Sequence, residues 1–265
     1  MRAIIVAGLL MASGAAAHAD TIRLHAAGSL KAALTDVARA FEKSSGGQHS
    51  VETTFGASGL LRERIENGEP THVFASANTS HPKQLVDSGK AEEPVRVFAR
   101  NELCALTRGG LSVPSDKLLE TMLAPATKLG TSTPKADPAG DYAFALFAKA
   151  EALKTGSTAQ LQAKALQLTG GPNSPKPTDG RSVYAWVMTS GQADVFLTYC
   201  TNAALAKAEA PELGIVDIPE ELNVGASYGL VVIKGMSDAA RSLADFILAP
   251  SGQSILANYG FKPGG

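Results

Sequence analysis

Short apolar stretches that fit β-strands alternate with amphipathic helical patterns along most of this 265-residue chain. The first predicted strand is 21–26, with Ile22 and Leu24 on one face. A helix begins near Ser29, and its apolar side chains recur at helical spacing: Leu30, Ala33, Leu34, Val37, Ala38 and Phe41. Because strand and helix alternate, we expect largely parallel sheets with helices on their faces.

The alternation continues in two series. The first contains strands at 51–55 and 73–76, with helices after residue 59 and at 82–88. The second lies between strands at 102–107 and 228–233, and it contains strands at 128–131, 195–199 and 215–218 with helices at 141–153, 158–166, 181–190 and 202–208. A Gly-, Pro-, Ser- and Asn-rich loop is expected at 170–178, and helices at 238–248 and 251–259 close the chain.

This order predicts two α/β lobes joined by two hinge crossings. Residues 20–98 together with 229–265 form the first predicted lobe, and residues 99–228 form the second. The crossings fall near 97–101 and 226–229. Ligands in open α/β sheets bind beyond the carboxyl ends of the strands, so we expect the site between the lobes.

The N-terminus has the pattern of a cleaved signal peptide. A charged start precedes an apolar run at 3–12, and Ala17-His18-Ala19 forms an A-x-A cleavage site. The run is too short to span a bilayer. We therefore predict that residues 1–19 are removed and that the mature protein is periplasmic.

The two cysteines, Cys104 and Cys200, fit that compartment in two ways. In an oxidising environment they can form a disulfide. Equally, two buried free thiols behave as small apolar side chains. The sequence does not show that the two side chains meet, so both alternatives stand.

The charge balance and the motifs exclude several classes of protein. The chain has 24 Lys and Arg against 25 Asp and Glu, which argues against nucleic acid as a partner. The histidines lack metal-ligand spacing, and neither a P-loop nor a G-x-G-x-x-G motif occurs. We expect no cofactor, no directly bound metal ion and no enzymatic activity.

Three turns of small residues carry the candidate chemistry, at 26–30, 55–59 and 138–142. Each leads into a predicted helix, where unpaired N–H groups and the helix dipole favour an anion. Ser29 and Ser58 add a hydroxyl to the first two turns. Alternatively, each serine is an ordinary helix N-cap with no role in ligand binding.

The second lobe offers five further candidates. Ala139 begins a long helix, and Gly180, Arg181 and Ser182 begin another, so their amides are available to an anion. Arg181 either neutralises the anion or forms a surface ion pair. Tyr199 ends a strand and either donates its phenolic O–H to a ligand or is a core tyrosine.

Together these stretches resemble the periplasmic molybdate-binding proteins of ABC importers, from Ile22 to Phe261. The resemblance rests on Ala27-Gly28-Ser29-Leu30, Phe55-Gly56-Ala57-Ser58, Ser76-Ala77-Asn78, Pro138-Ala139-Gly140-Asp141-Tyr142, Gly191-Gln192-Ala193-Asp194 with Tyr199, and Tyr259-Gly260-Phe261. Gly28, Asn78 and the stretch 200–202 depart from the family pattern.

The resemblance implies a two-lobed, type II periplasmic-binding-protein fold, with a mixed, mostly parallel sheet flanked by helices in each lobe. It implies that molybdate or tungstate is held between the lobes and delivered by a monomer to a membrane permease. The residues implied as ligand donors are the hydroxyls of Ser29, Ser58 and Tyr199, the amide of Ala139, and one amide from Gly180, Arg181 or Ser182.

Three alternatives remain open. The same fold can hold sulfate, phosphate or a small carboxylate, which Arg181 in the site would favour. A periplasmic enzyme using Ser58 or His72 would need a base within ~3 Å of its nucleophile. An interaction or sensor module would have a cleft filled by side chains.

Overall fold

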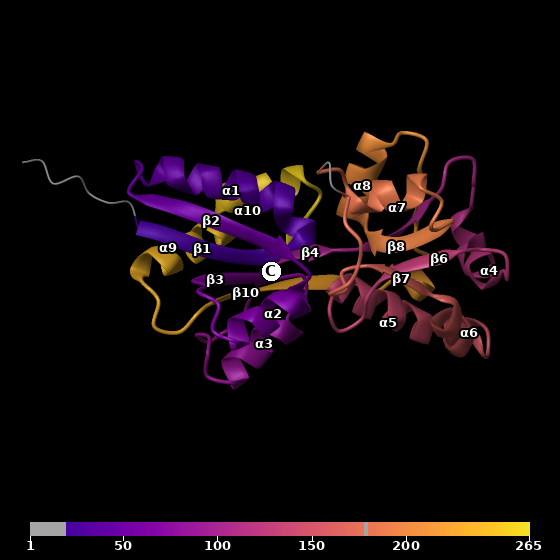
Figure 1. Ribbon diagram of the computed structural model, residues 1–265, viewed down its shortest axis with the longest axis horizontal. Helices are drawn as coiled ribbons and strands as arrows, with labels where there is room; N and C mark the ends of the chain where they lie inside the picture. Colours follow the sequence, from indigo (N-terminus) through magenta and orange to yellow (C-terminus); the bar gives the residue numbers. More distant parts are fainter. Residues whose placement is uncertain (1–19, 178–179) are drawn as a thin grey trace, which may run out of the picture.

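The computed structural model describes residues 20–177 and 180–265, and the predicted signal peptide at 1–19 lies outside these residues. Two lobes lie side by side along the long axis of the molecule, each built on its own sheet (Figure 1). No helix formed by residues 20–177 and 180–265 is both long enough and apolar enough to cross a membrane.

The first lobe contains a six-stranded sheet. Its strands, in spatial order, are β11 (Lys262–Pro263), β4 (Arg96–Asn101), β10 (Ala226–Val232), β3 (Val73–Ser76), β1 (Asp20–Ala27) and β2 (His49–Gly56). The pairs of β1 with β2 and β3 are parallel, whereas β10 is antiparallel to both β3 and β4. The sheet is therefore mixed, as predicted, but it is not mostly parallel. The strand that returns from the second lobe, β10, forms two antiparallel pairs, and β11 forms a third with β4.

Helices cover both faces of this sheet (Figure 1). One face carries α1 (Lys31–Ser44), α9 (Asp238–Leu248) and α10 (Pro250–Asn258), and the other carries α2 (Ser58–Glu66) and α3 (Ser80–Asp87). A 3-10 turn, η1 (Gly28–Leu30), connects β1 to α1. The predicted apolar face of α1 is buried, which confirms the helical periodicity of this segment.

The second lobe contains a five-stranded mixed sheet. Its strands, in spatial order, are β7 (Leu166–Thr169), β6 (Leu129–Ser132), β8 (Val195–Tyr199), β5 (Leu103–Thr107) and β9 (Gly214–Asp217). Strand β6 is parallel to β7 and β8, whereas β5 is antiparallel to β8 and β9. The flanking helices are α4 (Leu118–Leu123), α5 (Pro138–Leu153) and α6 (Ser157–Lys164) on one side, and α7 (Val183–Thr189) and α8 (Cys200–Glu209) on the other (Figure 1). Two more 3-10 turns are η2 (Ser115–Lys117) and η3 (Glu220–Leu222).

Most predicted elements are present, with differences at a few. Strand β8 has the predicted bounds, whereas the predicted helix 158–166 ends at Lys164 and the edge strand β7 follows it. Only the fourth residue of β7 is buried, so the strand has no strong apolar signal. Strand β4 and helix α4 were not predicted.

The lobes are joined where β4 leads into β5 and where β10 returns. Asn101, at the end of β4, is buried, and its Nδ2 donates to Thr201 Oγ1 at 2.9 Å and to Tyr228 Oη at 3.2 Å. Strand β4 pairs with the first sheet as far as Asn101, and β10 pairs from Ala226. The predicted lobe boundaries at 98/99 and 228/229 stay a prediction.

A disulfide lies next to this junction. Cys104 in β5 and Cys200 at the start of α8 are bonded, with their Cα atoms 4.8 Å apart. Of the two alternatives left open by the sequence, the structure contains the disulfide. It ties the sheet of the second lobe to the helix that begins directly after Tyr199.

Candidate functional site

A cavity of about 870 Å³ lies between the lobes. The turns after β1 and β2 line it from the first lobe, and the start of α5, the loop after β7 and the start of α7 line it from the second. The predicted site residues along this cavity are Ser29, Ser58, Gly180, Arg181, Ser182 and Tyr199. The fold therefore brings residues that are distant in the sequence to one space, and Ala139 is not among the described residues that line it.

Neither serine of the first lobe acts as a helix N-cap. Ser29 lies inside the 3-10 turn η1, and its Oγ is 3.1 Å from Tyr228 Oη. Ser58 is the first residue of α2 and is fully buried, and its Oγ accepts the Ala77 N–H at 3.1 Å. A hydroxyl that accepts one hydrogen bond still has its own hydrogen to donate. The donor role of Ser58 toward a ligand stays a prediction.

Tyr199 reaches the same space from the second lobe. It is the last residue of β8, its side chain is 1% exposed, and its Oη donates to the Ala77 carbonyl at 3.4 Å. Its ring packs against Tyr142 and Tyr228, with centroids 6.2 and 5.5 Å away. Burial raises the pKa of Tyr199 well above its usual value, so the phenol stays protonated and acts as a donor.

The start of α5 differs from the prediction. The Ala139 N–H donates to Asp137 Oδ1 at 3.0 Å, so this amide is already engaged by a carboxylate of the protein. Asp137 is the N-cap of α5, and it lines the cavity itself. The sequence analysis missed Asp137, although an Asp directly before a Pro that begins a helix is a recognisable N-cap signal.

Asp137 lies in a confined, polar environment. Burial raises the pKa of its carboxyl to about 6, and the nearby charge of Asp141 acts in the same direction. Hydrogen bonds from the Ala139 amide and the Ser132 hydroxyl oppose that rise. Gly170 packs closely against the carboxyl group, since a Cβ at Gly170 would lie 2.3 Å from Asp137 Oδ2.

At the start of α7 a second acid occupies the predicted donors. Ser182 caps α7 by accepting the Ala185 N–H, while its own N–H donates to Glu209 Oε2 at 2.8 Å. The Arg181 guanidinium lies 3.4 Å from Glu209 Oε1 and also contacts Thr189. Arg181 is therefore ion-paired with Glu209, the surface-pair alternative. Which residue of 180–182 meets a ligand stays a prediction.

The lobes touch at Gly59. Its N–H donates to the Ala136 carbonyl at 2.8 Å, and a Cβ at this position would lie 2.3 Å from the Lys135 carbonyl oxygen. Only a residue without a side chain permits this approach. We call this the Gly59–Ala136 contact. Residues on either side of it line two separate cavities of the interlobe space.

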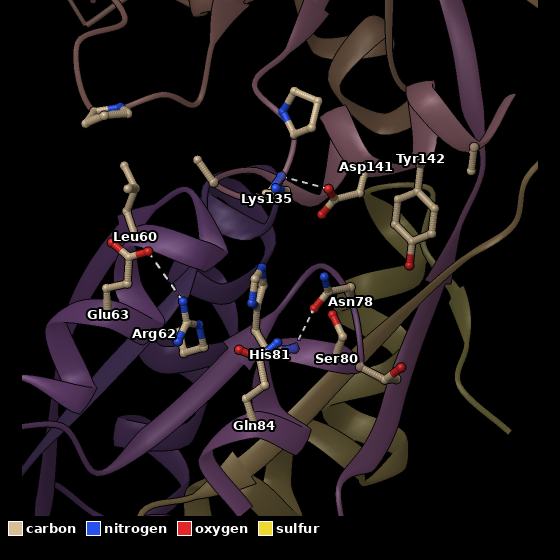
Figure 2. A pocket seen from close by; sticks show the side chains of 15 residues that line it. Leu60, Arg62, Glu63, Asn78, Ser80, His81, Gln84, Lys135, Asp141 and Tyr142 are labelled. Atoms are coloured by element: carbon tan, nitrogen blue, oxygen red, sulfur yellow. Dashed lines mark hydrogen bonds and ion pairs between the residues drawn. The ribbon is translucent and has the colours of Figure 1, made fainter. Parts of the chain in front are cut away.

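The second cavity, of about 920 Å³, has a different chemistry. Figure 2 shows His81 and Asn78 of the first lobe facing Lys135, Asp141 and Tyr142 of the second. The ring nitrogens of His81 have no hydrogen-bond partner among the described residues, and burial lowers the pKa of His81 to about 4. His81 is consequently neutral at physiological pH.

Among the described residues, the two side chains considered for an enzyme are engaged separately. Ser58 Oγ accepts a backbone N–H, and His72 Nδ1 accepts the Arg23 N–H at 2.7 Å. Within 20–177 and 180–265, no group of three or more His, Cys, Asp or Glu side chains is arranged to hold a metal ion.

Comparison with known proteins agrees with this geometry. The family model described as bacterial extracellular solute-binding protein matches residues 22–262. An uncharacterized protein of Pasteurella multocida (strain Pm70) is 36% identical over 246 residues, covering 91% of this chain and 98% of that protein. The molybdate-binding protein ModA of Escherichia coli (strain K12) is 25% identical over 257 residues, covering 95% and 92%.

Solved structures agree on the fold. The sulfate-binding protein SubI from Mycobacterium tuberculosis H37Rv matches with a TM-score of 0.75 at 19% identity, covering 92% of this chain and 87% of that chain. At such identity the likeness speaks for architecture alone. It confirms the predicted two-lobed fold of type II periplasmic binding proteins.

Proposed function

Because this chain belongs to the family of bacterial extracellular solute-binding proteins, we propose that it captures a small tetrahedral oxyanion, molybdate or tungstate, between its lobes. Members of this family bind solutes and are not enzymes. In this proposal the mature protein is exported, closes on the anion and delivers it to the permease of an ABC importer.

One observation carries the proposal: hydroxyl donors from both lobes line a single interlobe cavity. Ser29 and Ser58 contribute from the first lobe and Tyr199 from the second. Each hydrogen bond from such a neutral donor to an anion contributes roughly 1.5–3 kcal/mol. A ligand that bonds to both lobes favours the closed arrangement, because it binds that arrangement more tightly.

The relatives support an oxyanion without deciding which one. ModA of Escherichia coli is named for molybdate, and SubI of Mycobacterium tuberculosis is named for sulfate. Both ligands are tetrahedral dianions, so the choice between them depends on cavity size rather than on charge. The resemblance of the turns at Ser29, Ser58 and Ala139 to molybdate-binding proteins favours the larger anions.

Phosphate is the second candidate, and Asp137 is the observation that favours it. A carboxylate in the cavity accepts a hydrogen bond from a protonated phosphate oxygen, whereas it repels a fully deprotonated dianion. Under this alternative the same hydroxyls hold the other oxygens of the ligand.

Isothermal titration of the dialysed protein, lacking residues 1–19, tests both candidates. Molybdate, tungstate, sulfate and phosphate are titrated separately, and we expect one-to-one binding of molybdate and tungstate. Tight phosphate binding with no heat from molybdate would select the second candidate. Silence with all four anions would contradict the proposal and leave only the fold.

A further inference from the structure

We propose that anion capture by this protein is proton-coupled, with the Asp137 carboxyl and the bound oxyanion sharing one proton. This inference rests on the proposed function, because it concerns the same cavity. It goes further by assigning Asp137 as a specificity-determining residue and by making affinity depend on pH. An anion that enters an ionised site must bring a proton with it or take one from solvent.

The position of Asp137 is the first support. Its carboxyl group lies at the N-terminal end of α5 and lines the interlobe cavity. Oδ1 already accepts the Ala139 N–H, the amide that an anion at this helix start would use. The carboxylate thus stands beside the place where a ligand oxygen is expected, so the two acceptors compete for the same donor.

The carboxyl group is also held in place. Pro138, the first residue of α5, restricts the backbone that follows Asp137, and Gly170 packs against Oδ2. The Ser132 hydroxyl forms a second hydrogen bond to the carboxyl group. A side chain with these restraints does not simply leave when a ligand arrives. It stays beside the anion, and its charge has to be neutralised.

The charges around Asp137 do not perform that neutralisation. On its own helix Asp141 is a second acid, while Tyr184 of α7 and Tyr199 of β8 are phenols whose pKa values are raised by burial. Ser132 and Gly170 carry no charge. The charged residues that line other parts of the cavity are Lys31, Asp36, Arg39, Lys176 and Arg181. Among the described residues, the hydrogen bonds to the Asp137 carboxyl group come from the Ala139 amide and the Ser132 hydroxyl, which are both uncharged.

The free site is consequently poised near neutral pH. The pKa of Asp137 is raised to about 6, so at pH 7 the empty site is mostly ionised. A dianion beside it raises that pKa further, because like charges disfavour ionisation. Below about pH 6 the carboxyl is already protonated and binding takes up no proton. Above about pH 6, binding of each anion takes up one proton, and the affinity for the anion falls about tenfold per pH unit.

The test is titration calorimetry with molybdate and tungstate, which carry no proton of their own between about pH 6 and 8.5. Each titration is repeated in two buffers with different ionisation enthalpies, so that proton uptake is measured directly. For the wild-type protein we expect uptake to approach one proton per anion at the alkaline end. For Asp137→Asn we expect no uptake and an affinity independent of pH, since Asn keeps the N-cap acceptor without the charge.

Asp141→Asn is the matched control. Asp141 is another first-turn acid of α5, but it lines the second cavity and accepts the Lys135 N–H. This variant should keep the proton uptake, with its onset shifted to slightly lower pH because Asp141 no longer raises the pKa of Asp137. Asp137→Ser, which also retains a capping oxygen, replaces Asp137→Asn if that variant does not fold.

The outcomes separate the two proposals. Anion binding without proton uptake, or an unchanged pH slope in Asp137→Asn, would overturn the proton coupling and leave the proposed function standing. If neither the wild type nor Asp137→Asn binds molybdate or tungstate at about pH 6, the proposed function has failed, and the coupling fails with it.

Discussion

The donors of the two lobes are in different states before any ligand arrives. In the first lobe the described hydrogen-bond partners of Ser29 Oγ and Ser58 Oγ are neutral groups, the Tyr228 hydroxyl and the Ala77 N–H. In the second lobe each predicted amide with a described partner donates to an acid of the protein, Ala139 to Asp137 and Ser182 to Glu209. We therefore infer that Ser29 and Ser58 of the first lobe form a ready half-site. In the second lobe the proposed ligand would have to displace the carboxylates or share a proton with them.

Closure of the two halves is the largest effect to test. In Gly59→Ala the new Cβ would meet the Lys135 and Ala136 carbonyl oxygens at 2.3 and 2.7 Å, so the lobes cannot come together as they do now. We expect oxyanion affinity to fall by about 2–3 kcal/mol, the scale of overpacking at a tight contact. Calorimetry measures the affinity, and thermal unfolding should be nearly unchanged.

Gly225→Ala is the control for that substitution, because a Cβ at Gly225 meets nothing within 4 Å. Affinity of this variant should equal that of the wild type. Wild-type affinity in Gly59→Ala would show that the Gly59–Ala136 contact is not needed for binding.

The ready half-site should depend strongly on Ser58. Ser58→Ala removes the hydroxyl of a residue that lines the cavity and leaves the buried Ala77 N–H without this acceptor. We expect a loss of roughly 1.5–3 kcal/mol in anion binding, measured by calorimetry. Ser80→Ala, which alters the second cavity instead, should bind normally. Equal losses in both variants would mean that the two cavities are not distinct in function.

Tyr199 should contribute less, because its hydroxyl already bonds to Ala77 of the first lobe. Tyr199→Phe keeps the ring contacts with Tyr142 and Tyr228 and removes only the Oη. We expect anion binding, measured by calorimetry, to weaken by about 1 kcal/mol. We also expect lobe closure, monitored by small-angle X-ray scattering, to require more ligand. An unchanged affinity would assign Tyr199 to the core alone.

Glu209 should have the smallest effect, and one of opposite sign. Glu209→Ala removes the acceptor bonded to the Ser182 N–H and the acid paired with Arg181. Both groups then become available to an anion, so we expect affinity to rise by about 0.5–1 kcal/mol, since the pair is exposed and screened. A fall in affinity measured by calorimetry would show that Glu209 positions the start of α7 rather than competing with the ligand.

Much of the fold could be predicted because its signals are local. The apolar face of α1 and the bounds of β8 follow from spacing and from a continuous apolar run. Strand β7 could not be predicted, since an exposed edge strand carries little apolar signal. The antiparallel share of both sheets was also underestimated. It arises mainly from β5 and β10, whose direction depends on how the chain crosses between lobes, and also from the short terminal strand β11.

The candidate site, like the fold, could be predicted only in part. Local sequence was enough to find the turns at Ser29 and Ser58 and the tyrosine at the end of β8, because small residues and hydroxyls at helix starts have a recognisable pattern. Whether each donor is available to a ligand depends on partners elsewhere. The acceptor of the Ser182 amide is Glu209, on a different helix. Sequence spacing carries no information about that pairing.

Residue types and local periodicity thus predicted two α/β lobes, the helix starts and the candidate hydroxyls. Tertiary packing alone decided that Gly59 meets Ala136, that Glu209 occupies the Ser182 amide, and that the Asp137 carboxyl faces the cavity beside Gly170. The reason is physical: helix and strand patterns repeat within a few residues, whereas these contacts join segments whose distance is set only when both lobes have folded.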